Sequence, residues 1–139
     1  VGALVEEQQT VSLGPAATVQ EAAEKMAKHR IGAIPVLDSG KLMGLFTERD
    51  LLNRVVAAGL RPEEVSLEQV MTKDPITVTV DASLVKSLSI MFEHKFRHLP
   101  VLNDGQLAGV LSCRDIPTDY WMMWEKWVSA QNELKAAVG

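Results

Sequence analysis

The pattern of apolar and polar residues along the chain predicts one set of elements that occurs twice. Segments 33–37 (AIPVL) and 42–47 (LMGLFT) are apolar enough for buried strands, and the intervening DSGK turn predicts a β-hairpin. Apolar residues recur every three or four positions over 18–28, which predicts an amphipathic helix opened by the capping sequence TVQE. A short strand at 10–13 and a helix at 48–58 complete a strand-helix-strand-strand-helix unit.

The second half of the chain repeats this pattern at a constant offset of 65 residues, which carries Pro35 to Pro100. The stretch IPVLDSGKLMG aligns without a gap with LPVLNDGQLAG. The elements predicted for the second copy are strands at 76–80, 98–102 and 107–112, a helix at 83–94 and a helix that begins at 113. Two copies of this length predict two units related by a pseudo-two-fold axis.

Two segments lie outside the repeated pattern. A short helix is expected to begin at Ser66 in the linker, and Pro117 is expected to interrupt the last helix of the second unit because proline clashes with the preceding turn. We therefore expect an α/β (α+β) fold in which two pseudo-symmetric β-α-β-β-α repeats, at 1–62 and 63–117, pack their sheets together. A tryptophan-rich C-terminal helix over 118–139 follows them.

Composition and charge narrow the class of protein. Of the 139 residues, 47% are hydrophobic and 23% are charged, which is typical of a soluble globular protein. The formal net charge of −4 argues against a nucleic-acid partner. No apolar run approaches the roughly 18 residues that cross a bilayer, and the N-terminal sequence lacks signal-peptide features, so we expect no membrane partner. A single cysteine, Cys113, fits a reducing compartment and predicts cytoplasmic localisation.

Each copy ends its hairpin with a similar motif, GLFTERDL in the first and GVLSCRDI in the second. Thr47 with Asp50, and Ser112 with Asp115, place a hydroxyl three residues ahead of a carboxylate, a spacing typical of helix capping. Glutamate would cap at least as well, yet both copies use aspartate. A short carboxylate held at a helix start can also accept two hydrogen bonds from a cis-diol such as that of ribose. Capping and ribose binding both remain open.

The repeat resembles a tandem pair of cystathionine-β-synthase (CBS) domains, or Bateman module, and is similar to stand-alone proteins with two CBS domains. The resemblance covers about residues 1–117 and is carried by the two Pro-Val strands and the two Gly-h-h-[Ser/Thr]-x-x-Asp motifs. It implies a non-catalytic regulatory module that binds AMP, ADP, ATP, NAD or S-adenosylmethionine in clefts between the repeats. It also implies a homodimer that signals through its geometry or through contact with a regulated protein partner. The alternative is a protein-interaction or dimerisation module with empty clefts.

The resemblance also implies roles for individual residues. Asp50 and Asp115 would hold ribose hydroxyls. Thr47 and Ser112 would orient the ribose or the α-phosphate. The backbone implied to line the adenine is that of Val11, Ser12, Ala33, Ile34, Ile76, Thr77, His98 and Leu99. Pro35 and Pro100 are also implied to belong to the nucleotide sites.

The two expected clefts differ in charge. The second copy contains KFRHLP, which places Lys95, Arg97 and His98 near its cleft, whereas the first contains RIGAIP, with Gly32 and Ala33 at equivalent places. Cations attract phosphates, while glycine and alanine make room for a ring. Arg97 and His98 could equally belong to a solvated strand end. We nevertheless expect the second cleft to favour phosphates.

The sequence contains no catalytic constellation. It has no Ser-His-Asp order, Walker loop or glycine-rich phosphate loop, and its histidines lack metal-ligand spacing. We therefore expect no enzyme activity, no catalytic residue, no catalytic cofactor and no metal site. Arg49 and Arg114, which precede the two aspartates, either face a phosphate or pair with neighbouring acids.

The C-terminal segment YWMMWEKWV contains all three tryptophans of the chain. At helical spacing its apolar residues form one stripe, made by Tyr120, Trp124, Trp127, Val128 and Leu134 with Trp121 and Met122 beside it. The alternatives are packing onto the chain's own core, contact with a subunit or partner, and binding at a membrane interface. Contact with a subunit or partner is favoured because exposed aromatic patches mark interfaces.

Overall fold

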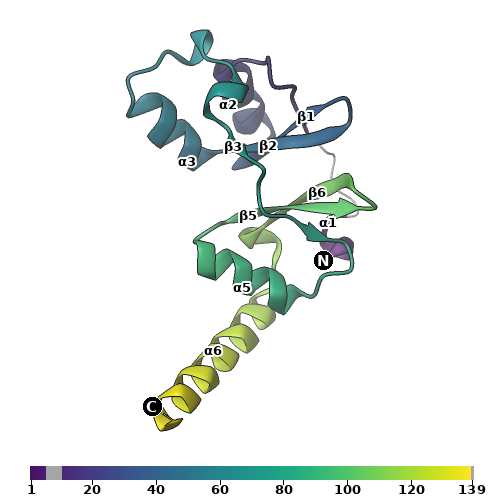
Figure 1. Cartoon of the computed structure of the whole chain (residues 1–139), viewed down its shortest axis with the longest axis vertical. Coiled ribbons are helices and arrows are strands. Elements are labelled where there is room, and N and C mark those ends of the chain that lie inside the picture. The colour runs from purple at the N-terminus through teal and green to yellow at the C-terminus, as the bar shows by residue number, and fades with distance from the viewer. Residues whose placement is uncertain (6–10, 139) are drawn as a thin grey trace.

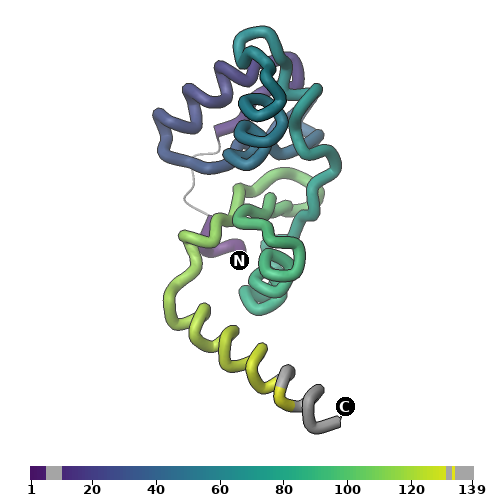
Figure 2. The backbone as a smooth tube through the Cα atoms, turned by 90° about the vertical axis from the view of Figure 1, so that its left-hand side faces the viewer, coloured from purple at the N-terminus to yellow at the C-terminus, as the bar shows by residue number. Residues whose placement is uncertain are grey.

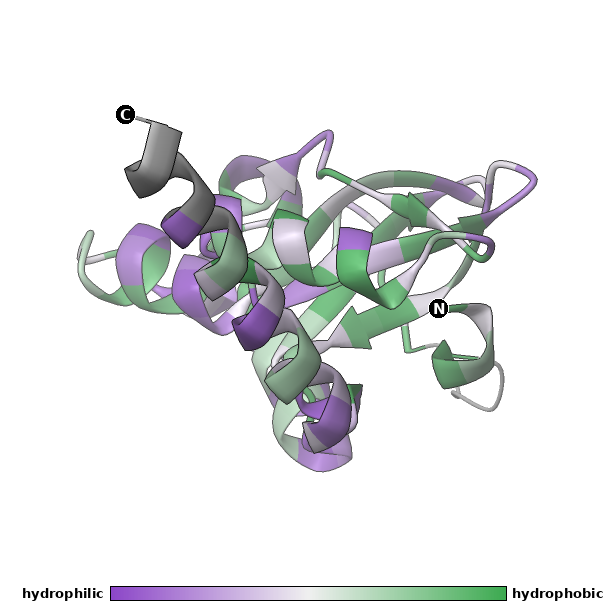
Figure 3. Cartoon of the chain, turned by 90° about the horizontal axis from the view of Figure 1, so that it is seen from below, coloured by the Kyte–Doolittle hydropathy of each residue, from purple (hydrophilic) through white to green (hydrophobic). Residues whose placement is uncertain are grey.

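The computed structural model describes residues 1–5 and 11–138, and from residue 131 onward it describes only the side chain of Glu133. The chain forms two units, each a three-stranded sheet with helices packed on it, which lie one above the other in Figure 1. The strands are mostly apolar, and the loops at the hairpin ends are polar (Figure 3). The expected α/β fold of two similar units with a C-terminal helix is confirmed.

The first sheet has the strand order β1-β2-β3. Strands β1 (Ala33–Asp38) and β2 (Lys41–Thr47) form the predicted antiparallel hairpin. Strand β3 (Thr72–Lys73) pairs antiparallel with the other edge of β2. Helix α2 (Val19–His29) packs on this sheet through its apolar face. The hydroxyl of Thr18 accepts an N–H of the first turn of α2, as the capping sequence predicted.

The second sheet has the strand order β4-β5-β6 and repeats the first. Strands β5 (His98–Asn103) and β6 (Gln106–Ser112) form the hairpin, and β4 (Val78–Thr79) pairs with β5 in parallel. Helix α5 (Leu84–His94) begins after its N-cap, Ser83, and packs on this sheet. Both hairpins shift register after the fourth residue of their first strand, so the two copies share even this irregularity of the backbone.

Two predicted strands are shorter in the structure. Of the strand expected at 10–13, only Leu13 pairs, in a single parallel bridge to Val36, because Gly14 and Pro15 turn the chain away at once. Residue 10 lies outside the described residues. The strand expected at 76–80 is reduced to β4, which is two residues long.

Two predicted helices also differ. The α-helix expected at 48–58 is a single turn, α3 (Glu48–Asp50), that continues as the π-helix η1 (Leu51–Val56). The apolar spacing did not indicate this wider turn, in which the backbone hydrogen bonds join residues i and i+5. The helix expected from 113 is one 3-10 turn, η3 (Cys113–Asp115), because Pro117 prevents its continuation.

The two units exchange segments. Helix α4 (Leu67–Val70), which follows the short 3-10 turn η2 (Pro62–Glu64) and begins at the predicted cap Ser66, packs into the core of the first unit. Helix α1 (Gly2–Val5), which the sequence did not predict, packs on the second unit, as Figure 1 shows. The boundary between 62 and 63 remains a prediction for the repeats in sequence, whereas in space each unit includes part of the other repeat.

Helix α6 (Thr118–Val138) begins directly after Pro117 and projects from the second unit (Figures 1 and 2). Its first turns pack on the second core, where the Trp124 ring lies 4.7 Å from that of Phe92, centroid to centroid. Within the described residues, no helix is both long and apolar enough to span a bilayer.

The predicted aromatic stripe therefore divides into two parts. Trp124 is buried, and Trp121 and Val128 pack against the core, whereas Tyr120 and Trp127 are exposed. Met122 is exposed as well, and the side chain of Leu134 lies outside what the structure describes. Packing on the chain's own core thus accounts for only one side of the stripe.

Candidate functional site

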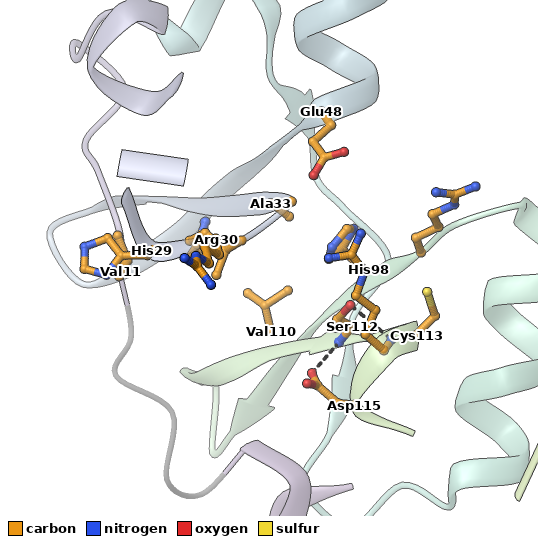
Figure 4. A pocket seen from close by; sticks show the side chains of 15 residues that line it. Val11, His29, Arg30, Ala33, Glu48, His98, Val110, Ser112, Cys113 and Asp115 are labelled. Atoms are coloured by element: carbon orange, nitrogen blue, oxygen red, sulfur yellow. Dashed lines mark hydrogen bonds between the residues drawn. The ribbon is translucent and has the colours of Figure 1, made fainter. Parts of the chain in front are cut away.

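Two cavities, of about 420 and 580 Å³, lie between the two units. We call the one that contains Asp115 cleft 1 and the one that contains Asp50 cleft 2. Cleft 1 is lined by the motif that ends in Asp115 and by the start of the first hairpin. Cleft 2 is lined by the motif that ends in Asp50 and by the start of the second hairpin. Figure 4 shows cleft 1, with Arg30 and Ala33 of the first repeat facing Ser112 of the second. Neither unit alone forms a complete cleft.

Most of the predicted site residues line these clefts. Those in cleft 1 are Val11, Ala33, Pro35, Ser112, Arg114 and Asp115. Those in cleft 2 are Thr47, Arg49, Asp50, Ile76 and Pro100. Arg97 and His98 line the cleft of the second motif, where they were expected, and also line cleft 2.

Four predicted residues do not line either cleft. Ile34 and Leu99 are fully buried in the two cores, because successive side chains of a strand point to opposite faces and their neighbours point toward the clefts. Ser12 and Thr77 lie next to lining residues but are not among them. The adenine-lining role implied for these four stays a prediction.

Asp115 caps η3 and keeps part of its carboxylate free. Its Oδ2 accepts the backbone N–H of Ser112 at 2.9 Å, and the Ser112 hydroxyl accepts the backbone N–H of Arg114 at 3.3 Å. Its Oδ1 accepts a hydrogen bond from none of the described residues, and the residue is exposed. The predicted cap is confirmed, and the carboxylate retains acceptor capacity toward cleft 1.

Asp50 has the same cap but a different environment. It is only 6% exposed, and its Oδ2 accepts the backbone N–H of Thr47 at 3.1 Å. The Thr72 hydroxyl lies 3.2 Å from Oδ2 and 3.3 Å from Oδ1, and Nε of Arg54 lies 3.6 Å from Oδ1. Both oxygens are therefore engaged within the protein. Two aspartates at equivalent positions of the repeated motif thus differ in what their carboxylates can still accept.

His98 and Glu48 occupy the wall between the clefts. A Cβ atom at Gly32 would lie 2.7 Å from Oε1 of Glu48 and 3.1 Å from Nε2 of His98. Gly32 therefore makes room for these two side chains. It also lines both clefts, and the expectation that it makes room for a ligand ring stays a prediction. In Figure 4 the His98 ring lies between Glu48 and Ser112.

Burial lowers the pKa of His98, and the nearby guanidinium of Arg114 lowers it further. The carboxylates of Glu48 and Asp115 act in the opposite direction on this pKa without cancelling the effect of burial. A phosphate placed in cleft 1 would add a third anion close to the imidazole, and would favour its protonated form.

The arginines of the clefts differ in their partners. Nη1 of Arg49 donates to the carbonyl oxygen of Lys95 at 3.1 Å, which joins the two units across cleft 2. Arg30, Arg97 and Arg114 line cleft 1, and in the described part of the chain their side chains form no ion pair or hydrogen bond. Neither Arg49 nor Arg114 pairs with an acid of the described residues, so that alternative for them is not realised. Cleft 1 thus presents three uncommitted guanidinium groups.

Sequence reasoning missed several lining residues. His29 is the last residue of helix α2, and Arg30 follows it in the left-handed conformation, at φ 55°. Both residues line cleft 1. Arg54 of η1 and Thr72 of β3 line cleft 2, and no repeated motif marks either of them. Among the described residues, no group of three or more His, Cys, Asp or Glu side chains is placed to bind a metal ion.

Comparisons with known proteins match the chain to one family. The model of the CBS domain matches residues 5–57 and 67–116. A CBS domain-containing protein of Arabidopsis thaliana is 36% identical over 129 residues, which are 92% of this chain and 24% of the plant protein. YhcV, a CBS domain-containing protein of Bacillus subtilis, is 33% identical over 108 residues, 78% of this chain and 76% of YhcV. The chain therefore spans about a quarter of the plant relative's length.

Solved structures agree in fold. A CBS domain protein from Pyrobaculum aerophilum complexed with AMP superposes with a TM-score of 0.78 at 29% identity, covering 88% of this chain and 95% of that one. A CBS-domain containing protein from Agrobacterium tumefaciens gives 0.76 at 35% identity, covering 83% and 94%.

Proposed function

This chain belongs to the CBS-domain family, and we propose that it is a non-catalytic regulatory module that binds an adenine nucleotide, AMP, ADP or ATP, in cleft 1. The observation that carries this proposal is the Asp115 carboxylate, which is held by its cap at the cleft with Oδ1 unpartnered among the described residues. A ribose cis-diol would complete its hydrogen bonding. The AMP complex of the Pyrobaculum relative supports the choice of ligand class.

The charges of cleft 1 support a phosphorylated ligand. The side chains of Arg30, Arg97 and Arg114 can approach phosphate oxygens, and guanidinium groups bind them through paired N–H donors. Ala33 is a small residue at the start of β1 and would leave room for the adenine ring beside Val11. NAD and S-adenosylmethionine share the adenosine group and are the next ligands to consider.

Signalling would pass through a homodimer or a regulated protein partner. Leu52 and Val56 of η1 are 60% and 59% exposed, and Phe92 of α5 is 64% exposed, so a helix of each unit presents apolar side chains to solvent. We infer that these helices meet their counterparts in a second copy, with Trp127 of α6 adding to the contact. The free thiol of Cys113 fits a cytoplasmic setting for this assembly.

Calorimetric titration with AMP, ADP and ATP, each paired with its 2′-deoxy form, tests nucleotide binding. We expect the ribonucleotides to bind more tightly, because a missing hydroxyl leaves the carboxylate of Asp115 under-satisfied. Sedimentation velocity with and without AMP tests the dimer. A monomer at tens of micromolar protein would contradict the dimer without bearing on the cleft.

The second candidate is an interaction module whose clefts stay empty. The exposed apolar helix faces favour it, because they would serve dimerisation whether or not a nucleotide binds. Normal self-association together with no heat of binding for any adenosine ligand would select this alternative.

A further inference from the structure

We propose that Thr72 and Arg54 determine the difference in affinity between the two clefts by occupying the carboxylate of Asp50, so that cleft 2 is the weaker nucleotide site. We call Asp50, Thr72 and Arg54 the Asp50 cluster. The inference rests on the proposed function, since it assumes that the clefts bind ribonucleotides.

The hydrogen bonds of the Asp50 cluster leave little for a ligand. A cis-diol needs two acceptor positions that it can reach, whereas Oδ2 of Asp50 already accepts from the Thr47 N–H and from the Thr72 hydroxyl. Oδ1 faces the Thr72 hydroxyl at 3.3 Å and the Arg54 guanidinium at 3.6 Å. With 6% of the residue exposed, a ribose would have to displace Thr72 or Arg54 before it could bind.

The two partners of Asp50 are held in place by the backbone. Nη1 of Arg54 also donates to the carbonyl oxygens of Val70 and Met71, at 3.3 and 3.1 Å, so one side chain joins Asp50 to the chain entering β3. Thr72 lies in β3, where a Cβ at Gly44 of β2 would come within 2.8 Å of its carbonyl oxygen. Gly44 thus permits the close strand contact that brings the Thr72 hydroxyl to Asp50.

The sequence does not offer the same residue types at the positions that the repeat relates to this cluster. At the offset of 65 residues, Arg54 corresponds to Asp119 and Thr72 corresponds to Glu7. Both are acids, and an ionised carboxylate cannot donate a hydrogen bond to another. The residue types that occupy Asp50 in the first motif are therefore absent from the second.

A different role for these residues predicts the opposite result. If Thr72 and Arg54 orient Asp50 for a ribose, their removal would weaken binding at cleft 2. If they compete with the ribose, their removal would strengthen it. The sign of the change in affinity therefore separates the two roles.

The test is calorimetric titration with AMP in an Asp115→Asn background, which leaves cleft 2 as the site with an intact aspartate. Thr72→Val removes the hydroxyl and keeps the shape of the side chain. Thr79→Val, on an exposed position of β4 away from both clefts, is the matched control. We expect Thr72→Val to tighten AMP binding by roughly tenfold, because one charge-assisted acceptor position becomes available. The control should not change the affinity.

Arg54→Gln is the second variant, in case Thr72→Val does not fold, and it too is expected to tighten AMP binding. Unchanged or weaker binding in the folded variants, while the protein with intact Asp115 binds AMP, would overturn this inference and leave the proposed function standing. Absence of AMP binding in the unmodified protein and in every variant would overturn the proposed function itself, and this inference with it.

Discussion

Replacing Asp115 by asparagine separates its two roles, because asparagine can keep the cap and cannot replace the anion. The amide oxygen of asparagine can still accept the Ser112 N–H that now lies 2.9 Å from Oδ2, so the free energy of unfolding should fall by no more than about 1 kcal/mol. The remaining amide N–H₂ group would face cleft 1 where Oδ1 now offers acceptor positions. A ribose hydroxyl would then lose a charge-assisted hydrogen bond worth about 1.5–3 kcal/mol.

The expected loss of nucleotide affinity is therefore roughly ten- to a hundredfold in Kd. Calorimetry on the unmodified protein, Asp115→Asn and Asp50→Asn measures it, with urea unfolding as the check on stability. Asp50→Asn should change Kd less, because the Asp50 carboxylate is already engaged by Thr72 and Arg54. A 2′-phosphate should also be rejected by the Asp115 charge, which disfavours NADP. Equal affinities in all three proteins, with no preference for ribose over deoxyribose, would refute the ribose role and leave both aspartates as caps.

The remaining predictions concern stability and assembly. Burial lowers the pKa of His98, so as the pH falls the histidine takes up a proton in the unfolded chain before it does so in the native protein. The free energy of unfolding should therefore decrease below about pH 6.5. In urea titrations, His98→Gln should remove this part of the pH dependence. Gly44→Ala should lower the free energy of unfolding by about 1–3 kcal/mol in the same assay, because its Cβ would press on β3. Trp127→Ser should weaken self-association in sedimentation and leave the melting temperature nearly unchanged, whereas Trp124→Ala should cost about 3–5 kcal/mol because Trp124 is buried. The same dimer content for Trp127→Ser would remove α6 from the proposed interface.

The features that could be predicted from the sequence are local or repeated. The two hairpins follow from short apolar runs that flank polar turns, and the caps at Thr47 and Ser112 follow from the spacing of hydroxyl and carboxylate. The break at Pro117 follows from the chemistry of proline. Each of these depends on residues within a few positions of one another, or on a match to the other copy.

The features that could not be predicted depend on contacts between distant segments. Asp50 and Asp115 look equivalent in sequence, yet Asp50 meets Thr72 from β3, 22 residues further along the chain. His98 was expected to serve one cleft and lines both, because the pseudo-symmetric pairing of the units puts the start of β5 at the wall between them. No local pattern marks such a contact, and the repeat itself conceals the asymmetry.

The most direct test of the central claim is the melting temperature of the full chain in the presence of AMP, ADP, ATP, NAD or S-adenosylmethionine, with and without Mg²⁺. A ligand that binds only the native state stabilises it by about 2.7 kcal/mol when its concentration is 100 times Kd. For a domain of this size that corresponds to a rise of several degrees, on the scale of about 2–8 °C per kcal/mol. We predict this rise for at least one adenine ribonucleotide, with a smaller rise for its 2′-deoxy form. An unchanged melting temperature with every one of these ligands at millimolar concentration would contradict nucleotide sensing by this protein.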